Sequence, residues 1–276
     1  MTLTCARAVQ GAQSLGMERL DAQMLLLHAL GRAPHDRAWL LAHGDDALPA
    51  TAQALLETLV QRRLSGEPMA YLTGFKEFYG LTLAVDARVL DPRPDTETLV
   101  DWALDALRGH TGARVVDLGT GSGAIALALQ HAQPDWQVQA VDLSAEALAV
   151  AQANALRLQL DVQFLQGSWL QGLTDRFDAI VSNPPYIVEG DRHLPALQHE
   201  PALALASGPD GLDAIRAIVA SAPAHLVPGG WLLLEHGYDQ AVPVRQLLES
   251  AGFVRVQSRC DLAGIERCSG GQIPAH

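Results

Sequence analysis

Apolar residues along the first 75 or so positions repeat with the period of a helix. In the segment 17–31, Leu20, Met24, Leu27 and Leu30 lie three or four residues apart, and Gly31 follows them as a helix stop. Two further helical segments, 35–44 and 50–66, also end at a glycine. The pattern predicts an N-terminal bundle of four or five helices over residues 1–75.

The pattern changes in the next residues. Two short alternating runs, Leu81 to Val85 and Arg88 to Leu90, predict a β-hairpin linker over residues 76–94. Apolar strand patterns then alternate with helical ones over residues 95–276, and this order is typical of βαβ units. We therefore expect an α/β domain with a mainly parallel sheet covered by helices on both faces. The strand patterns fall within residues 113–119, 136–143, 161–167, 177–183, 230–237 and 253–260.

Composition narrows the class of protein. Its 276 residues, 49% of them hydrophobic, suffice for two domains with substantial cores. The three cysteines form no CxxC pair, which favours reduced thiols and a cytoplasmic protein without a zinc site. We find neither a signal peptide nor an apolar run of roughly 18 residues, so no membrane association is expected. With a net charge of −12 and Lys76 as its one lysine, the chain is poorly suited to bind nucleic acid.

A glycine-rich turn follows the first strand of the α/β region. Gly119, Gly121 and Gly123 lie between this strand and a helix, where glycine lets the backbone approach a ligand. Asp142 ends the second strand and is placed to bind ribose hydroxyls. NAD and S-adenosylmethionine both use this arrangement. Asp117, expected at the rim of the turn, disfavours a pyrophosphate and favours the cationic amino group of S-adenosylmethionine.

Two further features of the sequence concern the choice of cofactor. Residues 115–131 contain no lysine or arginine to offset phosphate charge, which again favours S-adenosylmethionine. Gln166 and Trp169 follow the third strand, where they are placed to cover an adenine ring. The sequence leaves a second interpretation of Trp169 open, namely packing in the core.

The fourth strand ends in Ser-Asn-Pro-Pro-Tyr, a combination that needs an explanation. Pro184 and Pro185 donate no backbone hydrogen bond and restrict their neighbours to extended conformations. The ordinary interpretation is a strand terminator. However, ligands of open α/β sheets bind at the carboxyl ends of the strands, so this segment should lie beside the cofactor. There, the Asn183 side-chain oxygen and the Pro184 carbonyl are suited to orient a planar amide or amine, and Tyr186 to stack on it.

Several motifs in one order resemble a known family. They are PMAYLTGFKEFYGLTL, DPRPDTETLV, VVDLGTGSGAIALAL, SNPPYI, HEPALALASGPDGL, GGWLLLEHG and DLAGIER, within residues 68–267. Together they resemble the protein-(glutamine-N5) methyltransferases of peptide chain release factors (the PrmC/HemK family). The resemblance implies a class I methyltransferase fold with a seven-stranded sheet. It also implies S-adenosylmethionine as cofactor and, as substrate, the glutamine of the Gly-Gly-Gln loop of release factors.

The resemblance further implies site residues. The N-terminal helices would dock the release factor, and a monomer is expected. Arg93, Glu97 and Glu200 match family motifs, and we expect only pocket-closing loops there. The expected catalytic residues are Asn183, Pro184 and Tyr186, and Pro185 joins them in binding substrate. The expected cofactor residues are Asp117, Gly119, Thr120, Gly121, Ser122, Gly123, Asp142, Trp169 and Asn183.

Three other functions compete with this one. A nucleic-acid adenine or cytosine amino-methyltransferase would use the same Asn-Pro-Pro-Tyr but should carry a basic groove. An NAD-dependent oxidoreductase would leave that motif without a role, and a non-catalytic binding protein would not need the glycine turn. No metal site is expected, because paired histidine ligands and HExxH are absent from the sequence.

The end of the chain departs from the family pattern. An apolar last strand is expected after residues 261–267, but the polar segment CSGGQIPAH follows. We therefore expect a short or altered last strand. This tail contains Gly270-Gly271-Gln272, the triplet of the expected substrate, which we interpret as a coincidence rather than a pseudosubstrate.

Overall fold

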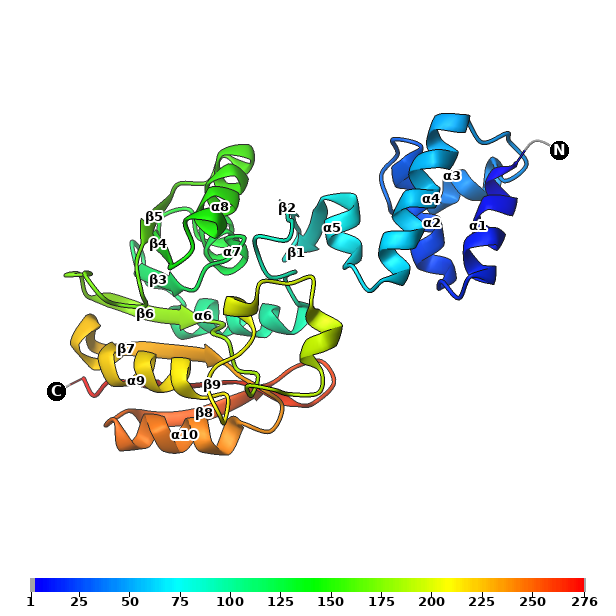
Figure 1. The fold of residues 1–276 in the computed structure, drawn as a ribbon. Helices are drawn as coiled ribbons and strands as arrows, with labels where there is room; N and C mark the ends of the chain where they lie inside the picture. Colours follow the sequence, from blue (N-terminus) through cyan, green and yellow to red (C-terminus); the bar gives the residue numbers. More distant parts are fainter. Residues whose placement is uncertain (1–2, 276) are drawn as a thin grey trace. The chain divides into compact units, whose positions relative to one another are not determined.

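The chain folds into two compact units in a computed structural model that describes residues 3–275. The units are Met1–Phe75 and Lys76–His276, and Figure 1 shows the elements of each. None of the helices within residues 3–275 is long and apolar enough to cross a membrane.

The first unit is a bundle of five helices, as the sequence predicts. Leu25, Leu26 and Leu27 are fully buried at its centre. The Thr4 hydroxyl accepts a hydrogen bond from the backbone N–H of Arg7 and caps the first helix. The helices are α1 (Cys5–Ser14), α2 (Arg19–Ala29), α3 (Arg37–Ala42), α4 (Ala50–Leu64) and α5 (Met69–Thr73).

The hairpin that follows differs from its prediction. It pairs β1 (Phe75–Phe78) with β2 (Leu81–Ala84), whereas the strand predicted over Arg88 to Leu90 is a turn. Tyr79 and Gly80 both have positive φ, as a two-residue hairpin turn requires. The Asp86 side chain accepts a hydrogen bond from the backbone N–H of Arg88, which stabilises a turn where a strand was expected.

The second unit is built on a seven-stranded sheet, which confirms the predicted α/β fold. Its strand order is β5-β4-β3-β6-β7-β9-β8, and only β9 runs antiparallel to its neighbours. The strands are β3 (Arg114–Leu118), β4 (Gln137–Asp142), β5 (Val162–Gln166), β6 (Phe177–Ser182), β7 (Leu226–Glu235), β8 (Val254–Cys260) and β9 (Glu266–Gln272).

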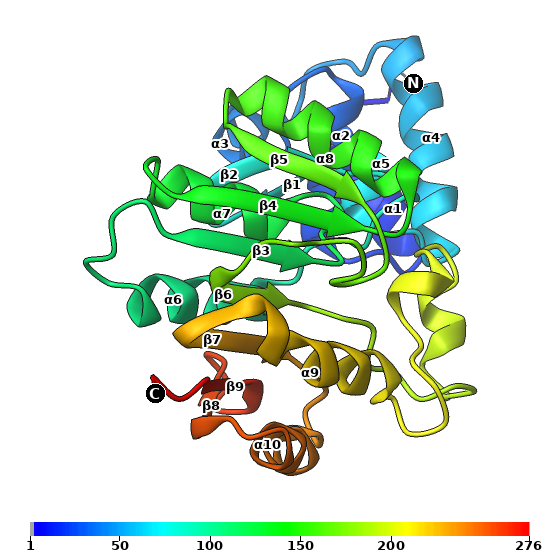
Figure 2. The same ribbon diagram turned by 90° about the vertical axis from the view of Figure 1, so that its left-hand side faces the viewer.

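Helices cover both faces of this sheet (Figures 1 and 2). One face carries α6 (Glu97–Ala106), α7 (Ala124–Ala132) and α8 (Ala145–Leu158). The other carries α9 (Asp213–His225) and α10 (Ala241–Ser250), which pack on a fully buried core that includes Ile180 and Leu232. Three short 3₁₀ helices complete the unit, η1 (Pro94–Thr96), η2 (Leu194–Leu197) and η3 (Ala202–Ala204).

The polar tail forms an inner strand, contrary to the expectation of a short or altered one. In β9, Gly270 pairs with Leu233, and Gly271 pairs with Leu232. A Cβ atom on Gly270 would lie 2.7 Å from the Leu232 carbonyl oxygen, so there is no room for a side chain. The two glycines are therefore needed for packing between β7 and β8. Cys268 is buried in the same strand, and Cys260 is exposed in β8.

Candidate active site

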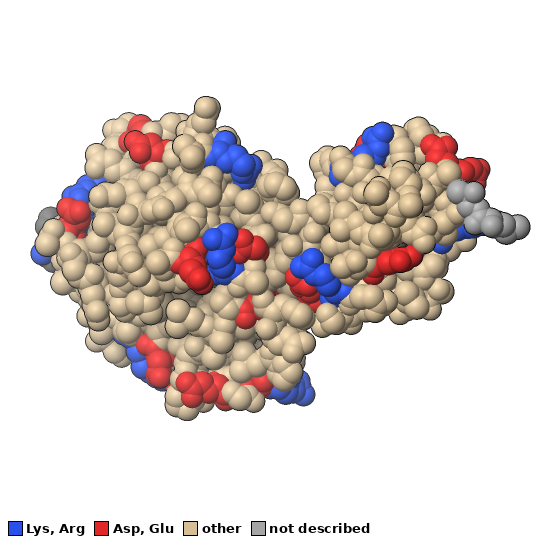
Figure 3. Space-filling model, turned by 45° about the horizontal axis from the view of Figure 1, so that its top comes forward, with Lys and Arg blue, Asp and Glu red and all other residues tan. Residues whose placement is uncertain are grey.

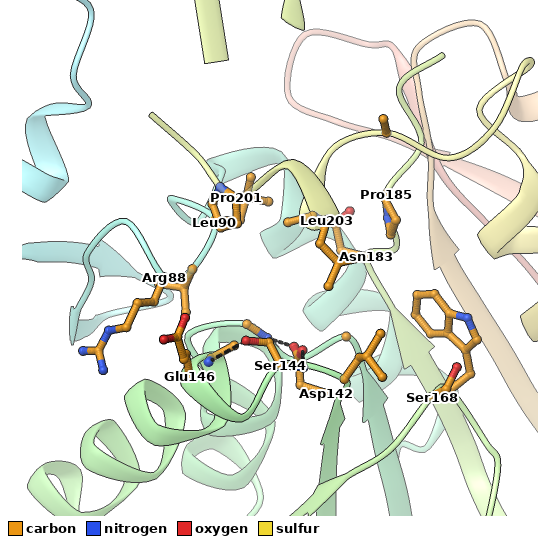
Figure 4. Close-up of a pocket in the computed structure, with 18 of the residues that line it drawn as sticks. Arg88, Leu90, Asp142, Ser144, Glu146, Ser168, Asn183, Pro185, Pro201 and Leu203 are labelled. Carbon is orange, nitrogen blue, oxygen red and sulfur yellow. Dashed lines mark hydrogen bonds between the residues drawn. The ribbon is translucent and has the colours of Figure 1, made fainter. Parts of the chain in front are cut away.

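A cavity of about 480 Å³ lies at the carboxyl ends of β3, β4 and β6. This is where the strand order reverses, because β4 and β5 extend from β3 in one direction and β6 and β7 in the other. Figure 4 shows Asp142, Ser144 and Glu146 on one side of the cavity and Asn183, Pro201 and Leu203 on the opposite side. The volume is in the range of small-molecule sites.

The glycine turn forms part of the cavity wall. Gly119 and Gly121 line it and have φ values of +72° and +55°, a region that side chains disfavour. A Cβ atom on Gly119 would lie 3.4 Å from the Trp169 ring. Trp169 itself lines the cavity and also packs against the core, so its position is compatible with either interpretation.

Asp142 is fixed at the end of β4 by backbone donors. Its Oδ2 accepts from the N–H of Gly121 and its Oδ1 from the N–H of Ser144, each at 2.9 Å. Each carboxylate oxygen has a second lone pair, which is available to a ligand hydroxyl in the cavity. The carboxylate therefore lines the cavity with acceptor capacity to spare.

The charged residues of the cavity suit a cationic cofactor. Asp142 and Glu146 are acidic, and the one basic lining residue, Arg88, forms a salt bridge with Asp86. A pyrophosphate would find little compensation here, whereas the sulfonium and ammonium groups of S-adenosylmethionine would be favoured. The residues present thus fit that cofactor.

Asp117 lies beneath the glycine turn and not at its rim, which corrects the sequence-based placement. Its side chain is fully buried, and its Oδ2 accepts from the Thr120 hydroxyl at 2.6 Å and from the Ala126 N–H at 3.3 Å. Burial raises the pKa of Asp117 to about 7. The carboxyl group therefore braces the turn and the start of α7 from below.

The segment Asn183–Tyr186, which we call the NPPY stub, projects from the end of β6. Asn183 and Pro185 line the cavity. The Asn183 side-chain nitrogen donates to the Thr96 hydroxyl at 3.2 Å. Pro184 is buried behind the cavity wall.

Tyr186 is half-buried and its backbone is held from outside the stub. Its carbonyl oxygen accepts from the Gln240 side chain at 3.1 Å. Gly211 packs so closely that a Cβ atom there would lie 2.2 Å from the same oxygen. Burial, followed by the charge of Glu235, raises the pKa of the phenol, so Tyr186 stays neutral.

The predicted site residues thus divide into two groups and one exception. Most of the cofactor set and part of the substrate set line the cavity, five others are buried around it, and Tyr186 is half-buried and does not line it. The lining residues are Gly119, Gly121, Asp142, Trp169, Asn183 and Pro185. The buried supporting residues are Asp117, Thr120, Ser122, Gly123 and Pro184. Gln166, by contrast, is exposed and donates to the Leu143 carbonyl oxygen.

Sequence reasoning gave no role to a buried charged group on the loop over the cavity. Glu200 is buried and forms a salt bridge with Arg93, and it also accepts from the Asp91 N–H at 3.3 Å. Pro201, next to Glu200, lines the cavity. Arg93 and Glu200 thus lie in segments beside the cavity, as expected of pocket-closing loops, whereas Glu97 begins α6 and accepts from the Tyr79 N–H at 2.9 Å. The DPRPDT and HEPAL motifs carried the signal for the first two.

Charged side chains on the drawn face alternate in sign. Figure 3 shows lysine and arginine atoms beside aspartate and glutamate atoms, without a concentrated basic patch on that face. Several of the salt bridges join surface residues, including Arg216 with Asp210 and Arg108 with Asp105. This face thus shows no basic groove of the kind that a nucleic-acid methyltransferase would need.

Comparison with known proteins gives two family matches within the chain. Residues 96–200 match a model described as a methyltransferase small domain. Residues 3–74 match a model described as a PrmC N-terminal domain.

Curated relatives match over nearly the whole length. The release factor glutamine methyltransferase of Bordetella pertussis is 52% identical, over 94% of this chain and 96% of its own. The release factor glutamine methyltransferase of Xylella fastidiosa (strain Temecula1) is 50% identical, over 97% of this chain and 98% of its own. Among solved structures, the 16S rRNA N2 G1207 methyltransferase RsmC of T. thermophilus, in complex with AdoMet and guanosine, has a TM-score of 0.54 at 25% identity. That match covers 72% of this chain and 49% of the RsmC chain.

Proposed function

Because this chain belongs to the family of release factor glutamine methyltransferases, we infer that it methylates the glutamine side chain of a release factor. Its cofactor is S-adenosylmethionine. We propose that the target is the glutamine of the Gly-Gly-Gln loop and that the amide nitrogen receives the methyl group. The observation that carries this proposal is the position of Asn183 on the cavity wall, in a chain that matches these relatives over more than nine-tenths of its length.

The cofactor half of the cavity has defined roles for its residues. We propose that Asp142 binds the ribose hydroxyls and that Gly119 and Gly121 let the backbone approach the ligand closely. Trp169 would cover the adenine. When bound, S-adenosylmethionine supplies an electrophilic methyl group on its sulfonium.

The NPPY stub is proposed to activate the side-chain amide of the substrate glutamine, which is a poor nucleophile. The lone pair of an amide nitrogen is delocalised into its carbonyl group. We propose that the Asn183 Oδ1 and the Pro184 carbonyl oxygen accept the two N–H groups of the substrate and direct its nitrogen at the methyl carbon. This nitrogen would then receive the methyl group, with the thioether form of the cofactor as the leaving group, and the amide proton would pass to solvent. The Tyr186 ring would hold the amide plane by stacking.

The first unit is proposed to recognise the body of the release factor. Its match to the PrmC N-terminal domain supports this role. We further propose that the enzyme acts as a monomer in the cytoplasm, where translation terminates, without binding nucleic acid directly.

The test of function is methyl transfer to an unmodified release factor. The protein is incubated with S-adenosylmethionine and the factor, and peptide mass spectrometry locates any added methyl group. A single methyl on the Gly-Gly-Gln glutamine is expected. Cofactor binding without methyl on that residue would contradict the substrate proposal, and methylated RNA or DNA would favour the amino-methyltransferase alternative.

Asn183→Ala gives the matched variant for this experiment. It removes one acceptor from the stub while Pro184 and Tyr186 stay in place. We expect transfer to fall at least about 100-fold, in line with the loss of a preorganised polar group. Binding of S-adenosylmethionine, measured by calorimetry, should change only slightly. Transfer at the wild-type rate would contradict the role of Asn183.

A further inference from the structure

The amide group of Asn183 is held on its nitrogen side by two buried residues. Its Nδ2 donates to the Thr96 hydroxyl at 3.2 Å. The Glu235 carboxyl group is close enough to Asn183 and Thr96 for both side chains to oppose the rise of its pKa, and its Oε2 has no hydrogen-bond partner among residues 3–275. Thr96 and Glu235 are only 4% and 1% exposed. The three side chains therefore form a small buried network behind the cavity wall.

The fold brings these residues together from distant parts of the chain. β6 and β7 are parallel neighbours in which Ser182 pairs with Leu234, so Asn183 and Glu235 are the next residues along each strand. Thr96 is the last residue of η1, just before α6. The network thus joins two strand ends to the start of a helix.

The donors and acceptors of the network determine which end of the Asn183 amide group faces it. An ionised carboxylate only accepts hydrogen bonds, so the neighbouring Glu235 would accept from the Thr96 hydroxyl and from the Asn183 side-chain nitrogen. The Thr96 oxygen then accepts from Asn183. Both partners attract the amide nitrogen, and a carboxylate repels the amide oxygen.

We propose that Thr96 and Glu235 are positioning residues that hold the Asn183 nitrogen and so keep its carbonyl oxygen toward the substrate. This rests on the proposed function of the cavity. An asparagine side chain has nearly the same shape when its amide group is turned over, so packing alone would not select one orientation. If the group turned over, an N–H donor would face the substrate's own N–H groups.

The charge of Glu235 depends on several neighbours. Burial raises its pKa to about 7, and the hydrogen bond from Thr96 opposes this rise. Asp95 of η1 raises the pKa further, while Arg267 of β9 lowers it. Tyr186 and Cys268 also lie within range of this charge. We therefore expect the orientation of Asn183 to weaken as the pH falls through about 7.

The sequence offers an unusually direct test, because Asn154 and Asn183 are its only asparagines. Protein labelled with ¹⁵N-asparagine should show two side-chain amide nitrogens by NMR, one for each asparagine. The nitrogen signal that disappears in Asn183→Ala belongs to Asn183. Asn154 serves as an internal control, since its nitrogen donates to the carbonyl oxygens of Ala84 and Ser122, away from the network. In Thr96→Val, the Asn183 signal should move and its hydrogens should exchange faster, while the Asn154 signal stays. An unmoved Asn183 signal would overturn the proposal.

Kinetics on release factor tests the consequence for transfer. Thr96→Val should lower kcat at least about tenfold with little change in the Kd for S-adenosylmethionine, and Thr96→Ser should restore kcat to within about threefold. Equal kcat in Thr96→Val and wild type would overturn the proposal. So would a loss of kcat, cofactor binding and thermal stability together that Thr96→Ser does not rescue. If wild type itself fails to methylate the factor, the proposed function fails, and the NMR measurement still tests the network.

Discussion

Gly211 packs directly behind the NPPY stub and limits where the backbone of Tyr186 can lie. Its φ is +75°, and the space for a Cβ atom is filled by the Tyr186 carbonyl oxygen. We expect Gly211→Ala to displace the stub and lower kcat at least about tenfold, because small displacements of reacting groups are costly. The measurement is kcat with release factor as substrate.

Gly190 provides the matched control for this prediction. It has a φ of +78°, so an alanine there carries a similar backbone strain, but nothing lies within 4 Å of its Cβ position. Gly190→Ala should keep kcat within about twofold of wild type. If both variants lose activity equally, backbone strain and not contact with Tyr186 is responsible.

Single residues also show which parts of the site a sequence can reveal. Asn183 was predictable because two prolines and a strand end mark its place in the chain. Thr96 and Glu235 were not, because their importance comes from the pairing of β6 with β7 and from the position of η1. Asp117 was placed at the rim for a related reason, since the spacing gives its distance from the turn but not the direction of its side chain.

The loop 188–205 is the element most directly tied to the cavity. Hydrogen bonds between Ile187 and the backbone of Leu205 and Ser207 close its base. Further along, the Arg93–Glu200 salt bridge fixes the stretch that carries Pro201 and cavity-lining residues after it. The position of this wall therefore depends on a charge pair whose carboxylate is buried.

Arg93→Met tests the contribution of that pair. The change leaves the Glu200 carboxylate buried without its main partner, which is strongly unfavourable. We expect the loop to loosen and the KM for S-adenosylmethionine to rise at least about fivefold. Arg216→Met is the control, since Arg216 pairs with Asp210 and Asp213 on the surface and should change KM less than twofold. An unchanged KM in Arg93→Met would show that the pair does not hold the wall.

β9 depends on the absence of side chains at its centre. Gly270→Ala would place a methyl group 2.6 Å from a Leu233 methyl carbon and 2.7 Å from the Leu232 carbonyl oxygen. We expect the free energy of unfolding to fall by about 1–3 kcal/mol, the usual cost of overpacking. Gly11→Ala, in α1 with open space around its Cβ position, should be neutral or slightly stabilising. Urea denaturation measures both, and equal stability of Gly270→Ala and wild type would contradict the packing argument.

Elements with a regular pattern were predictable, and elements defined by partners were not. The helices of the first unit and the strands β3 to β8 follow apolar periodicity closely. β9 reads Glu-Arg-Cys-Ser-Gly-Gly-Gln, which resembles a loop, because its neighbours leave no space for large side chains. The hairpin was misplaced for a similar reason, since a Tyr-Gly turn is a weaker signal than Asn-Gly.

At the scale of the whole molecule, two buried carboxyl groups should make stability depend on pH. Burial raises the pKa of Asp117 from 3.8 to about 7 and that of Glu235 from 4.5 to about 7. Such groups bind protons more tightly in the folded state, so their contribution is complete below the ordinary pKa and is lost as the pH rises through about 7. As the pH rises from about 5 to about 8, these two groups therefore lower the free energy of unfolding.

Asp117→Asn isolates one of these groups. Buried His236, whose pKa is lowered by burial, acts in the opposite direction below pH 6.5, so total stability is a mixture. Subtracting the unfolding free energy of the variant from that of wild type removes the other groups. As the pH rises from 3.8 to about 7, this difference in unfolding free energy should fall by about 1.4 kcal/mol per pH unit. Above pH 7 it should level off. Parallel curves for the two proteins would contradict the raised pKa of Asp117.

The position of β9 between β7 and β8 also affects how the protein is made. A ribosome delivers residues in order, at roughly 5–20 per second, and β9 is the last described strand to emerge. Until it does, β7 and β8 lack the partner that joins them, and β7 also carries Glu235 beside Asn183. A nascent chain therefore cannot complete its sheet one strand at a time. Translation that stops before Glu266 yields a product without this inner strand, and we expect such a product to be a substrate for proteolysis.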